Sequence, residues 1–550
     1  MLASKNRVCV IGLDGATFDV IHPMAAQGKL PNLKKIMEQG VSQELPSVIP
    51  PITTSAWTSF MTGKNPGKHG IFHFRANPSD IDCAEFTSGA YIGCKTMWET
   101  FKDEGIQTIA INVPMTYPLF PVEGIMISGM MTPGENVQFA HPPEILEEIN
   151  REVGEYHLDP KVQALGAPAL EDWVKGFFEV EEQRGKAIVH LLKKKPWELA
   201  VAIIDITDRV GHLCWRYYRQ DGKTTSSPLL KDGIEKCYEL ADRILGEILA
   251  VLPDDTTVLV MSDHGFGSCE KLFYTNEWLR RNGYLTPRRV TPLNFRKVLG
   301  CEVRRTTLEN VLIRTGANAL RRFLPRTLLE RVLSIPVVRR RQGSCSIDWS
   351  RTRAYGAGRG IYINLKGRQP EGIVEPDEFD QLRDEILGKL RELQDTQTAE
   401  KVVTLAFKKE DVYTGAFVDE PPDLLFGLKD LAYVQIDQLV FGKLFRPSKG
   451  GTHRMNGILM MQGTLVNPEA SLRDISILDI APTLHYLLGL PVPDDMDGRV
   501  LVDAFEASFV DANPVETHHI EREDVRHRGE LNPEDAAELE RRLRLLGYIG

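Results

Sequence analysis

The fold is decided by a short apolar stretch near the start of the chain, VCVIG at residues 8–12, which runs directly into Leu13-Asp14-Gly15. A stretch that is apolar at every position is typical of a parallel strand buried on both faces. This strand ends in a carboxylate, Asp14, and ligands of open α/β sheets bind outside that end of the strands. Taken alone, Asp14 fits a turn residue before Gly15 equally well, so the neighbouring strands decide its role.

Two later stretches repeat this pattern of an apolar strand followed by acids. LAVAII at residues 199–204 is followed by Asp208 and His212, which are four residues apart and therefore face the same side of a helical turn. TVLVM at residues 257–261 runs into Asp263 and His264, a carboxylate beside an imidazole. Helical patterns separate the strands, and this alternation predicts an α/β fold with a mainly parallel central sheet sandwiched by helices.

A hydroxyl-rich stretch lies between the first two of these strands, PPITTSAWTSFMTG at residues 50–63. Its prolines favour an extended approach, its hydroxyl residues stand at the start of a helix, and Gly63 ends that helix. The N-terminus of a helix attracts negative charge, so Thr53 or Thr54 is placed to attack a phosphoryl group held at the same turn. A plain N-cap is the alternative for either hydroxyl.

The composition argues against several classes of protein. The net charge of -10 argues against general nucleic-acid binding. Because the chain has no stretch of about 18 apolar residues, no transmembrane helix is predicted. The first strand starts too near Met1 to leave room for a signal peptide, so we expect a cytoplasmic protein. The eight cysteines are scattered and are expected to be reduced, so a metal would need other ligands.

Residues 280–341 form a basic stretch in an otherwise acidic chain, with 16 arginines and lysines against three glutamates. Leucines at partly helical spacing predict an inserted amphipathic helical element, bounded at 276–345. Four roles stay open for it: a solvated helical cap, a peripheral membrane contact, a collar for an anionic substrate, and a partner interface. The rest divides into a catalytic core at 1–275 and 346–505 and a polar tail with a C-terminal helix at 506–550. The oligomeric state is not predicted.

Seven side chains of metal-binding or nucleophilic type lie mostly at or just after predicted strand ends: Asp14, Thr53, Asp208, His212, Asp263, His264 and His453. His453 stands in a glycine-containing stretch, GGTHR at residues 450–454, before a strand at 458–461. Carboxylate and imidazole ligands together suit Zn²⁺, or Mn²⁺ with more oxygen ligation. Seven groups suffice for two divalent metal ions that share a nucleophile, an arrangement that lowers the pKa of a hydroxyl and stabilises phosphoryl oxygens.

Five motifs occur in the order typical of one family: GLDG at 12–15, Thr53 with TGKNPGKHG at 62–70, DRVGH at 208–212, SDHG at 262–265 and GTH at 451–453. Through them the chain resembles the type I phosphodiesterase/nucleotide pyrophosphatase family of the alkaline phosphatase superfamily, over most of residues 7–275 and 350–500. The resemblance implies an alkaline-phosphatase-like fold with two metal ions. It further implies two ligand groups, which are Asp14, Thr53, Asp263 and His264 around one ion and Asp208, His212 and His453 around the other.

The resemblance also implies a function. Thr53, ten residues before Gly63, is implied as the nucleophile. Thr54 and Arg75 are expected to contact the substrate, because Phe74 stands where diesterases of the family often place a phosphate-binding asparagine; a residue of the basic insert is the alternative anion contact. The implied activity is hydrolysis of a small phosphodiester, pyrophosphate or nucleotide-type substrate through a phosphothreonine. Phosphomonoester or phosphonate hydrolysis and phosphoryl transfer are alternatives within the superfamily, and a catalytically spent binding or scaffold protein that uses the basic insert is the alternative of another class.

Overall fold

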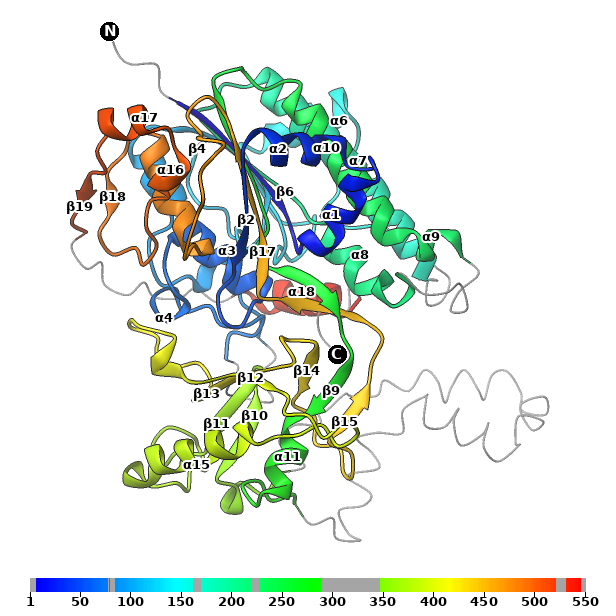
Figure 1. Ribbon diagram of the computed structural model, residues 1–550, viewed down its shortest axis with the longest axis vertical. Coiled ribbons are helices and arrows are strands. Elements are labelled where there is room, and N and C mark those ends of the chain that lie inside the picture. Colours follow the sequence, from blue (N-terminus) through cyan, green and yellow to red (C-terminus); the bar gives the residue numbers. More distant parts are fainter. Residues whose placement is uncertain are drawn as a thin grey trace, which may run out of the picture.

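The computed structural model describes residues 6–77, 79, 85–161, 170–218, 227–288, 347–520 and 531–545. These residues form two lobes, each built around its own β-sheet (Figure 1). The larger lobe contains an eight-stranded sheet flanked by helices, and the smaller lobe contains a seven-stranded sheet. The larger lobe has the α/β architecture predicted from the sequence.

The sheet of the larger lobe is mainly parallel, as predicted. Its strands stand in the order β2 (Val41–Pro46), β17 (Asn456–Gln462), β7 (Thr256–Met261), β1 (Arg7–Leu13), β6 (Leu199–Ile204), β3 (Gln107–Val113), β4 (Glu123–Ser128) and β5 (Ala140–His141). The strands from β7 to β4 run parallel, whereas β17 and β5 are antiparallel to their neighbours. Along β1, Val8 and Val10 pack into one apolar layer, and Cys9 and Ile11 pack into the other. Burial on both faces explains why these strands are continuous apolar stretches.

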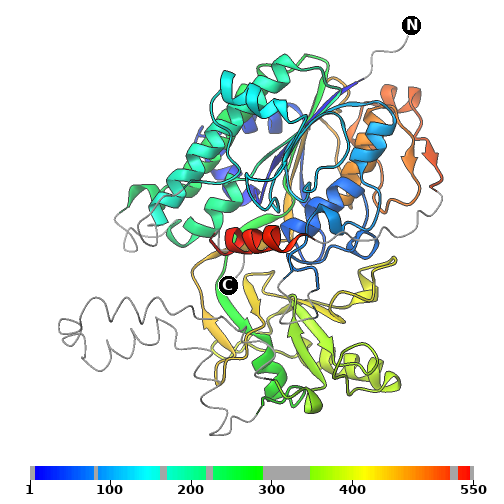
Figure 2. The same ribbon diagram turned by 180° about the vertical axis from the view of Figure 1, so that it is seen from behind.

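Helices cover both faces of this sheet (Figures 1 and 2). One apolar layer contains α1 (Phe18–Ala26), α2 (Pro31–Gln39), α6 (Glu144–Glu152), α7 (Leu170–Lys194), α8 (Ile206–Cys214), α9 (Pro228–Lys231) and α10 (Gly233–Leu249). The other contains α3 (Thr53–Thr62), α5 (Met97–Asp103), α16 (Ile480–Leu487) and α17 (Ala507–Ala512). The short α4 (Pro66–His69) follows α3, and β18 (Val492–Pro493) pairs with β19 (Thr517–His518).

The smaller lobe is formed largely by a part of the chain that the sequence analysis counted with the catalytic core. Its strands are β10 (Ala354–Ala357), β11 (Gly360–Ile363), β12 (Val403–Lys408), β13 (Leu424–Leu428), β14 (Tyr433–Ile436) and β15 (Phe445–Pro447), joined by β9 (Lys271–Tyr274). The helices α11 (Thr275–Arg281) and α15 (Phe379–Arg391) belong to the same lobe. A two-stranded ladder of β8 (Gly265–Ser268) and β16 (Gly451–Arg454) connects the lobes, because β8 leads into β9 and β15 leads into β16.

Two predicted segments lie partly outside the described residues. The predicted basic helical insert is described only up to residue 288, so the prediction for 289–345, with its proposed membrane contact, falls outside them. In the polar tail, α18 (Pro533–Leu545) lies at the base of the larger lobe (Figure 2, red), with Leu539 and Leu543 buried. Among the described helices, none combines the length and the apolar character needed to cross a membrane.

Candidate active site

Three strand ends bring the predicted ligands to one edge of the central sheet. Asp14 follows β1, the ligand-bearing helix α8 follows β6, and Asp263 and His264 follow β7. Because β7, β1 and β6 are parallel neighbours, their carboxyl ends lie side by side. His453 comes to the same edge from β16. The site therefore lies where the larger lobe meets the ladder that leads to the smaller lobe.

The first triad is Asp14, Asp263 and His264, whose potential ligand atoms all lie within 4.8 Å of one another. One oxygen of each carboxylate is held, because Trp57 Nε1 donates to Asp14 Oδ2 at 3.0 Å and the Gly15 N–H donates to Asp263 Oδ1 at 3.2 Å. The other oxygens, Asp14 Oδ1 and Asp263 Oδ2, are buried and find no hydrogen-bond donor in the described part of the chain. Two such oxygens beside a buried imidazole suit a metal cation.

His264 and Trp57 are both held in place for this role. His264 Nδ1 lies 3.1 Å from Gly265 O, so a proton on Nδ1 is donated there and Nε2 keeps its lone pair. The indole of Trp57 lies directly over β1, where a Cβ at position 12 would be 2.5 Å from the ring. Gly12 therefore permits the close approach that brings Trp57 Nε1 to Asp14.

The second triad is Asp208, His212 and His453. The two Nε2 atoms each lie 3.4 Å from Asp208 Oδ1 and 3.0 Å from one another. His453 Nδ1 lies 2.9 Å from Pro51 O and donates to it, which leaves Nε2 available as a ligand. The rings of His453 and His264 stack with centroids 3.7 Å apart, so the two triads are adjacent. Each triad contains the residues that the resemblance assigned to one ion, and metal binding itself stays a prediction.

The pKa values of the three aspartates in the two triads indicate that this site favours added positive charge. Burial, followed by the charges of Asp263 and Asp208, raises the pKa of Asp14 well above its usual range. Burial, followed by the Asp208 charge, raises the pKa of Asp263 to about 8. Burial also acts to raise the pKa of Asp208, but His212 and His453 lower it overall. A divalent cation would supply positive charge to this buried group of acids, so the electrostatics also fit a metal centre.

Thr53 is the first residue of α3, and Ile52 is the N-cap of that helix. No side chain caps α3, so the plain N-cap alternative is wrong for both Thr53 and Thr54. Thr53 Oγ1 instead lies 3.2 Å from His264 Nε2, at the first triad. Thr54 Oγ1 is buried and forms no hydrogen bond with the described residues. Since the first N–H groups of a helix have no partner within it, α3 can offer donors to an anion beside Thr53.

Arg75 belongs to neither triad. It is half-buried on a loop of the larger lobe, where its backbone forms an isolated antiparallel bridge with Phe86. Burial, followed by the charges of Arg359 and Arg75, lowers the pKa of His73 to about 3, so the two arginines lie near the same imidazole. Contact of Arg75 or Thr54 with a substrate stays a prediction.

Ion pairs that were not predicted from the sequence hold the ligand helix α8. Arg209 Nε donates to Asp205 Oδ2 at 2.8 Å, and Arg184 Nη1 donates to Asp205 Oδ1 at 2.9 Å. Arg209 Nη1 also donates to Asp159 Oδ1 at 2.8 Å, and Asp159 Oδ2 accepts from Arg542 Nε of α18 at 2.5 Å. The C-terminal helix is thereby tied to the helix that carries two predicted ligands. Only the four-residue spacing of Asp205 and Arg209 gave a sequence signal for this network.

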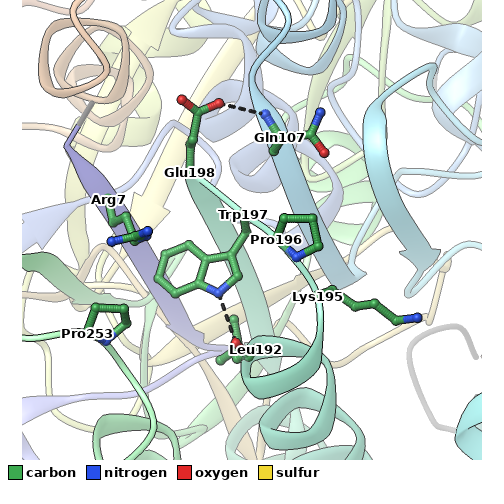
Figure 3. A pocket seen from close by; sticks show the side chains of 8 residues that line it. All are labelled: Arg7, Gln107, Leu192, Lys195, Pro196, Trp197, Glu198 and Pro253. Carbon is green, nitrogen blue, oxygen red and sulfur yellow. Dashed lines mark hydrogen bonds between the residues drawn. The ribbon is translucent and has the colours of Figure 1, made fainter. Parts of the chain in front are cut away.

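A separate surface pocket lies at the opposite edge of the central sheet, near the amino ends of β1, β3 and β6 (Figure 3). It is lined by Arg7, Gln107, Leu192, Lys195, Pro196, Trp197, Glu198 and Pro253. Glu198 Oε2 accepts from the Gln107 N–H at 3.0 Å, and Trp197 Nε1 donates to Leu192 O at 3.1 Å. The two triads stand at the carboxyl ends of the strands, so this pocket is not part of the candidate site.

Comparison with known proteins identifies the family of this chain. A family model described as type I phosphodiesterase / nucleotide pyrophosphatase matches residues 8–434. No curated protein matches the chain.

Three solved structures match this chain over most of its length. Phosphonoacetate hydrolase from Sinorhizobium meliloti 1021 is 14% identical with a TM-score of 0.51, over 88% of this chain and 95% of that one. Wild-type alkaline phosphatase PafA is 12% identical with a TM-score of 0.52, over 92% and 100%. Murine ectonucleotide pyrophosphatase / phosphodiesterase 5 is 15% identical with a TM-score of 0.45, over 91% and 100%. At these identities, the first two show a shared fold.

Proposed function

The chain belongs to the type I phosphodiesterase/nucleotide pyrophosphatase family of the alkaline phosphatase superfamily, and from this premise we propose that it is a two-metal hydrolase that works through a phosphothreonine at Thr53. Family membership places it among the hydrolases of phosphoric esters. The observation that carries the finer proposal is the position of Thr53 Oγ1, at the start of α3 and 3.2 Å from His264 Nε2 of the first triad. A nucleophile, an anion-binding helix end and a cluster of metal ligands thus meet at one point.

The proposed ligands are Asp14, Asp263 and His264 for one ion, with Thr53 beside them, and Asp208, His212 and His453 for the other. When bound, two divalent ions supply Lewis acidity to the phosphoryl oxygens and lower the pKa of the threonine hydroxyl. Zn²⁺ suits this mixed nitrogen and oxygen set, and Mn²⁺ is the second choice.

The chain's own residues carry the reaction in two steps. Thr53 Oγ1 attacks phosphorus, the bond from phosphorus to the leaving-group oxygen breaks, and the proton given up by the Thr53 hydroxyl is balanced by the proton that the leaving-group oxygen takes up. Backbone N–H groups at the start of α3 bind the phosphoryl oxygens while Thr53 is phosphorylated. A water molecule then attacks the phosphorylated Thr53, the bond from Oγ1 to phosphorus breaks, and a proton of that water restores the hydroxyl. A diester or nucleotide-type substrate thereby releases a phosphate monoester, and a monoester releases inorganic phosphate.

We propose a small phosphodiester, pyrophosphate or nucleotide-type substrate, contacted by Thr54 and Arg75. Hydrolysis of a monoester or a phosphonate, and transfer to an acceptor other than water, are the alternatives within the superfamily. A spent scaffold is less well supported, because five of the six triad side chains are buried and all six keep metal-binding chemistry.

Turnover of a substrate panel tests the proposal. Nitrophenyl phosphate monoesters, diesters and a phosphonate would be assayed after loading with Zn²⁺ or with Mn²⁺. We expect hydrolysis of at least one ester class, and a fall in kcat of about 10²-fold or more for Thr53→Ala, the scale seen when a key transition-state group is lost. Thr54→Ala removes a proposed substrate contact but keeps the nucleophile, and it should lower kcat much less. Metal-loaded protein that hydrolyses none of the panel, or a Thr53→Ala variant with near-normal kcat, would contradict the proposal.

A further inference from the structure

The chain enters α3 through a short segment, residues 49–52, that contains two prolines. Pro50 and Pro51 have no N–H group, so hydrogen bonds hold this stretch of backbone chiefly through its carbonyl oxygens. The middle carbonyl is held locally, because Pro50 O accepts from the Ile52 N–H at 2.9 Å. The carbonyls of Ile49 and Pro51 are held by two side chains from distant parts of the chain. The position of the segment therefore depends on those two side chains.

One of the two side chains belongs to the second triad and the other to the smaller lobe. His453 Nδ1 donates to Pro51 O at 2.9 Å, and this bond orients the ring so that Nε2 faces the triad. Tyr413, which lies between β12 and β13, donates its hydroxyl to Ile49 O. Thr53 follows directly after the segment as the first residue of α3. The segment thus connects a tyrosine of the smaller lobe with a proposed metal ligand and with the proposed nucleophile.

Tyr413 is itself fixed against the larger lobe. It is only 2% exposed, and its ring meets that of Phe72 edge-on with centroids 5.3 Å apart. The next residue is also anchored, because the Thr414 N–H donates to Asn65 Oδ1 at 3.1 Å and its hydroxyl accepts from Asn65 Nδ2 at 3.0 Å. Asn65 stands just after α3 in the chain. The smaller lobe is therefore attached on both sides of the helix that begins with the proposed nucleophile.

We propose that Tyr413 is a positioning residue, whose hydroxyl fixes residues 49–52 and through them both Thr53 and His453. The proposal rests on the proposed function, since it takes Thr53 and the second triad as parts of one active site. Attack on phosphorus needs an aligned nucleophile, and a displacement of about 1 Å can lower the rate about 10²-fold. The six triad residues all lie outside the strands and helices of the smaller lobe. Through Tyr413, that lobe still takes part in the reaction by holding the approach to α3.

Tyr413→Phe tests this inference because it removes the hydroxyl and keeps the ring that contacts Phe72. The matched control is Tyr486→Phe, which removes the hydroxyl of another buried tyrosine, one that donates to Asn513 O at 2.8 Å. Each metal-loaded full-length protein would be compared by hydrogen exchange of the backbone N–H groups at 52–56, read by peptide mass. The Kd of each metal ion would come from competition with a chelator, and kcat and KM from the best nitrophenyl ester. Thermal unfolding shows whether the two variants lose similar stability.

We expect exchange at 52–56 to be about fivefold faster or more in Tyr413→Phe, because the segment loses one of its three carbonyl anchors. The metal ion that depends on His453 should bind about fivefold or more weakly, while the Kd of the other ion changes less than about twofold. The kcat should fall about tenfold or more, and KM should change less than about twofold, because the nucleophile and not substrate binding is displaced. Tyr486→Phe should match the wild-type protein in all of these measurements.

The inference is overturned if exchange at 52–56 is unchanged in Tyr413→Phe, or if exchange becomes faster along the whole chain and both metal ions bind equally weakly. Faster exchange at 52–56 with unchanged kcat and unchanged metal affinities would also overturn it. Wild-type protein that hydrolyses no ester contradicts the proposed function, and exchange with metal affinity then decides this inference alone. Active protein that is phosphorylated on Thr53, but whose Tyr413→Phe variant behaves as wild type, overturns this inference and leaves the proposed function standing.

Discussion

Trp57→Phe should weaken metal binding at the first triad while leaving the second triad unchanged. The indole Nε1–H donates to Asp14 Oδ2 at 3.0 Å in a buried site, and phenylalanine keeps an aromatic ring but removes the donor. A hydrogen bond to a charged group contributes about 1.5–3 kcal/mol. At about 1.4 kcal/mol for each factor of ten, its loss corresponds to a metal Kd about 10- to 100-fold higher. This range matches the usual effect of removing a partner of a metal ligand.

The assay is competition between the metal-free protein and a fluorescent chelator, with Zn²⁺ added stepwise so that two binding events are resolved. Trp98→Phe is a matched control, because Trp98 is also fully buried and its Nε1 faces only the weak acceptor Met61 Sδ at 3.3 Å. Both variants lose similar ring volume, so a difference between them isolates the hydrogen bond to Asp14. Equal metal affinities in the two variants would refute the assignment of Asp14 as a metal ligand held in place by Trp57.

Three further results are expected. His453→Ala should remove one of two bound metal ions and leave the other, as measured by elemental analysis, and loss of both or neither would contradict the division into two triads. Metal-free protein should unfold at a lower temperature at pH 8 than at pH 5. In the folded protein Asp263 has a pKa of about 8, whereas in the unfolded chain it ionises near its ordinary pKa of 3.8. Between these two pKa values only the unfolded chain loses this proton, so the stability of the fold decreases as the pH rises from 3.8 to about 8. Asp263→Asn should reduce the difference in unfolding temperature between pH 5 and pH 8, and an unchanged difference would contradict this role of Asp263. Arg542→Ala should lower the free energy of unfolding, measured by urea titration, by about 1.5–3 kcal/mol, because it leaves Asp159 with one partner fewer. The control is Arg541→Ala, at an exposed arginine that is paired within α18, and it should lower the free energy of unfolding by less than about 0.5 kcal/mol. Equal losses in the two variants would mean that the link to Asp159 is not stabilising.

Much of the central fold was predictable because buried parallel strands are apolar along their whole length. The stretches at 8–12, 199–204 and 257–261 lie within β1, β6 and β7, and the acids that follow them meet at one edge of the sheet. Parallel strands direct their carboxyl ends to the same edge, so three separate signals in the sequence specify one place in space. The position of His453 was less predictable from local sequence, since it reaches that edge from the β8–β16 ladder.

The smaller lobe and the supporting contacts were not predictable in the same way. Its strands are short, and β9 pairs with β14 through partners such as Lys271 and Tyr433, which no local pattern indicates. Trp57 has the sequence environment of an ordinary packing residue, and its bond to Asp14 depends on how α3 lies over β1. Arg542 and Asp159 are 383 residues apart in sequence, so their contact exists only in the folded chain.

The central claim is that Thr53 becomes phosphorylated during turnover. Metal-loaded protein would be mixed with its best nitrophenyl ester from the panel, quenched in acid within the first turnovers, digested, and analysed by peptide mass with fragmentation. We expect the phosphoryl group of that ester on Thr53 in the peptide that begins α3, as phosphate from a monoester or as the substituted phosphoryl group from a diester or phosphonate, and no such group in the same peptide of Thr53→Ala. The same group found on Thr54 or Ser55 instead, or its absence from this peptide in protein that is turning over substrate, would contradict phosphorylation of Thr53.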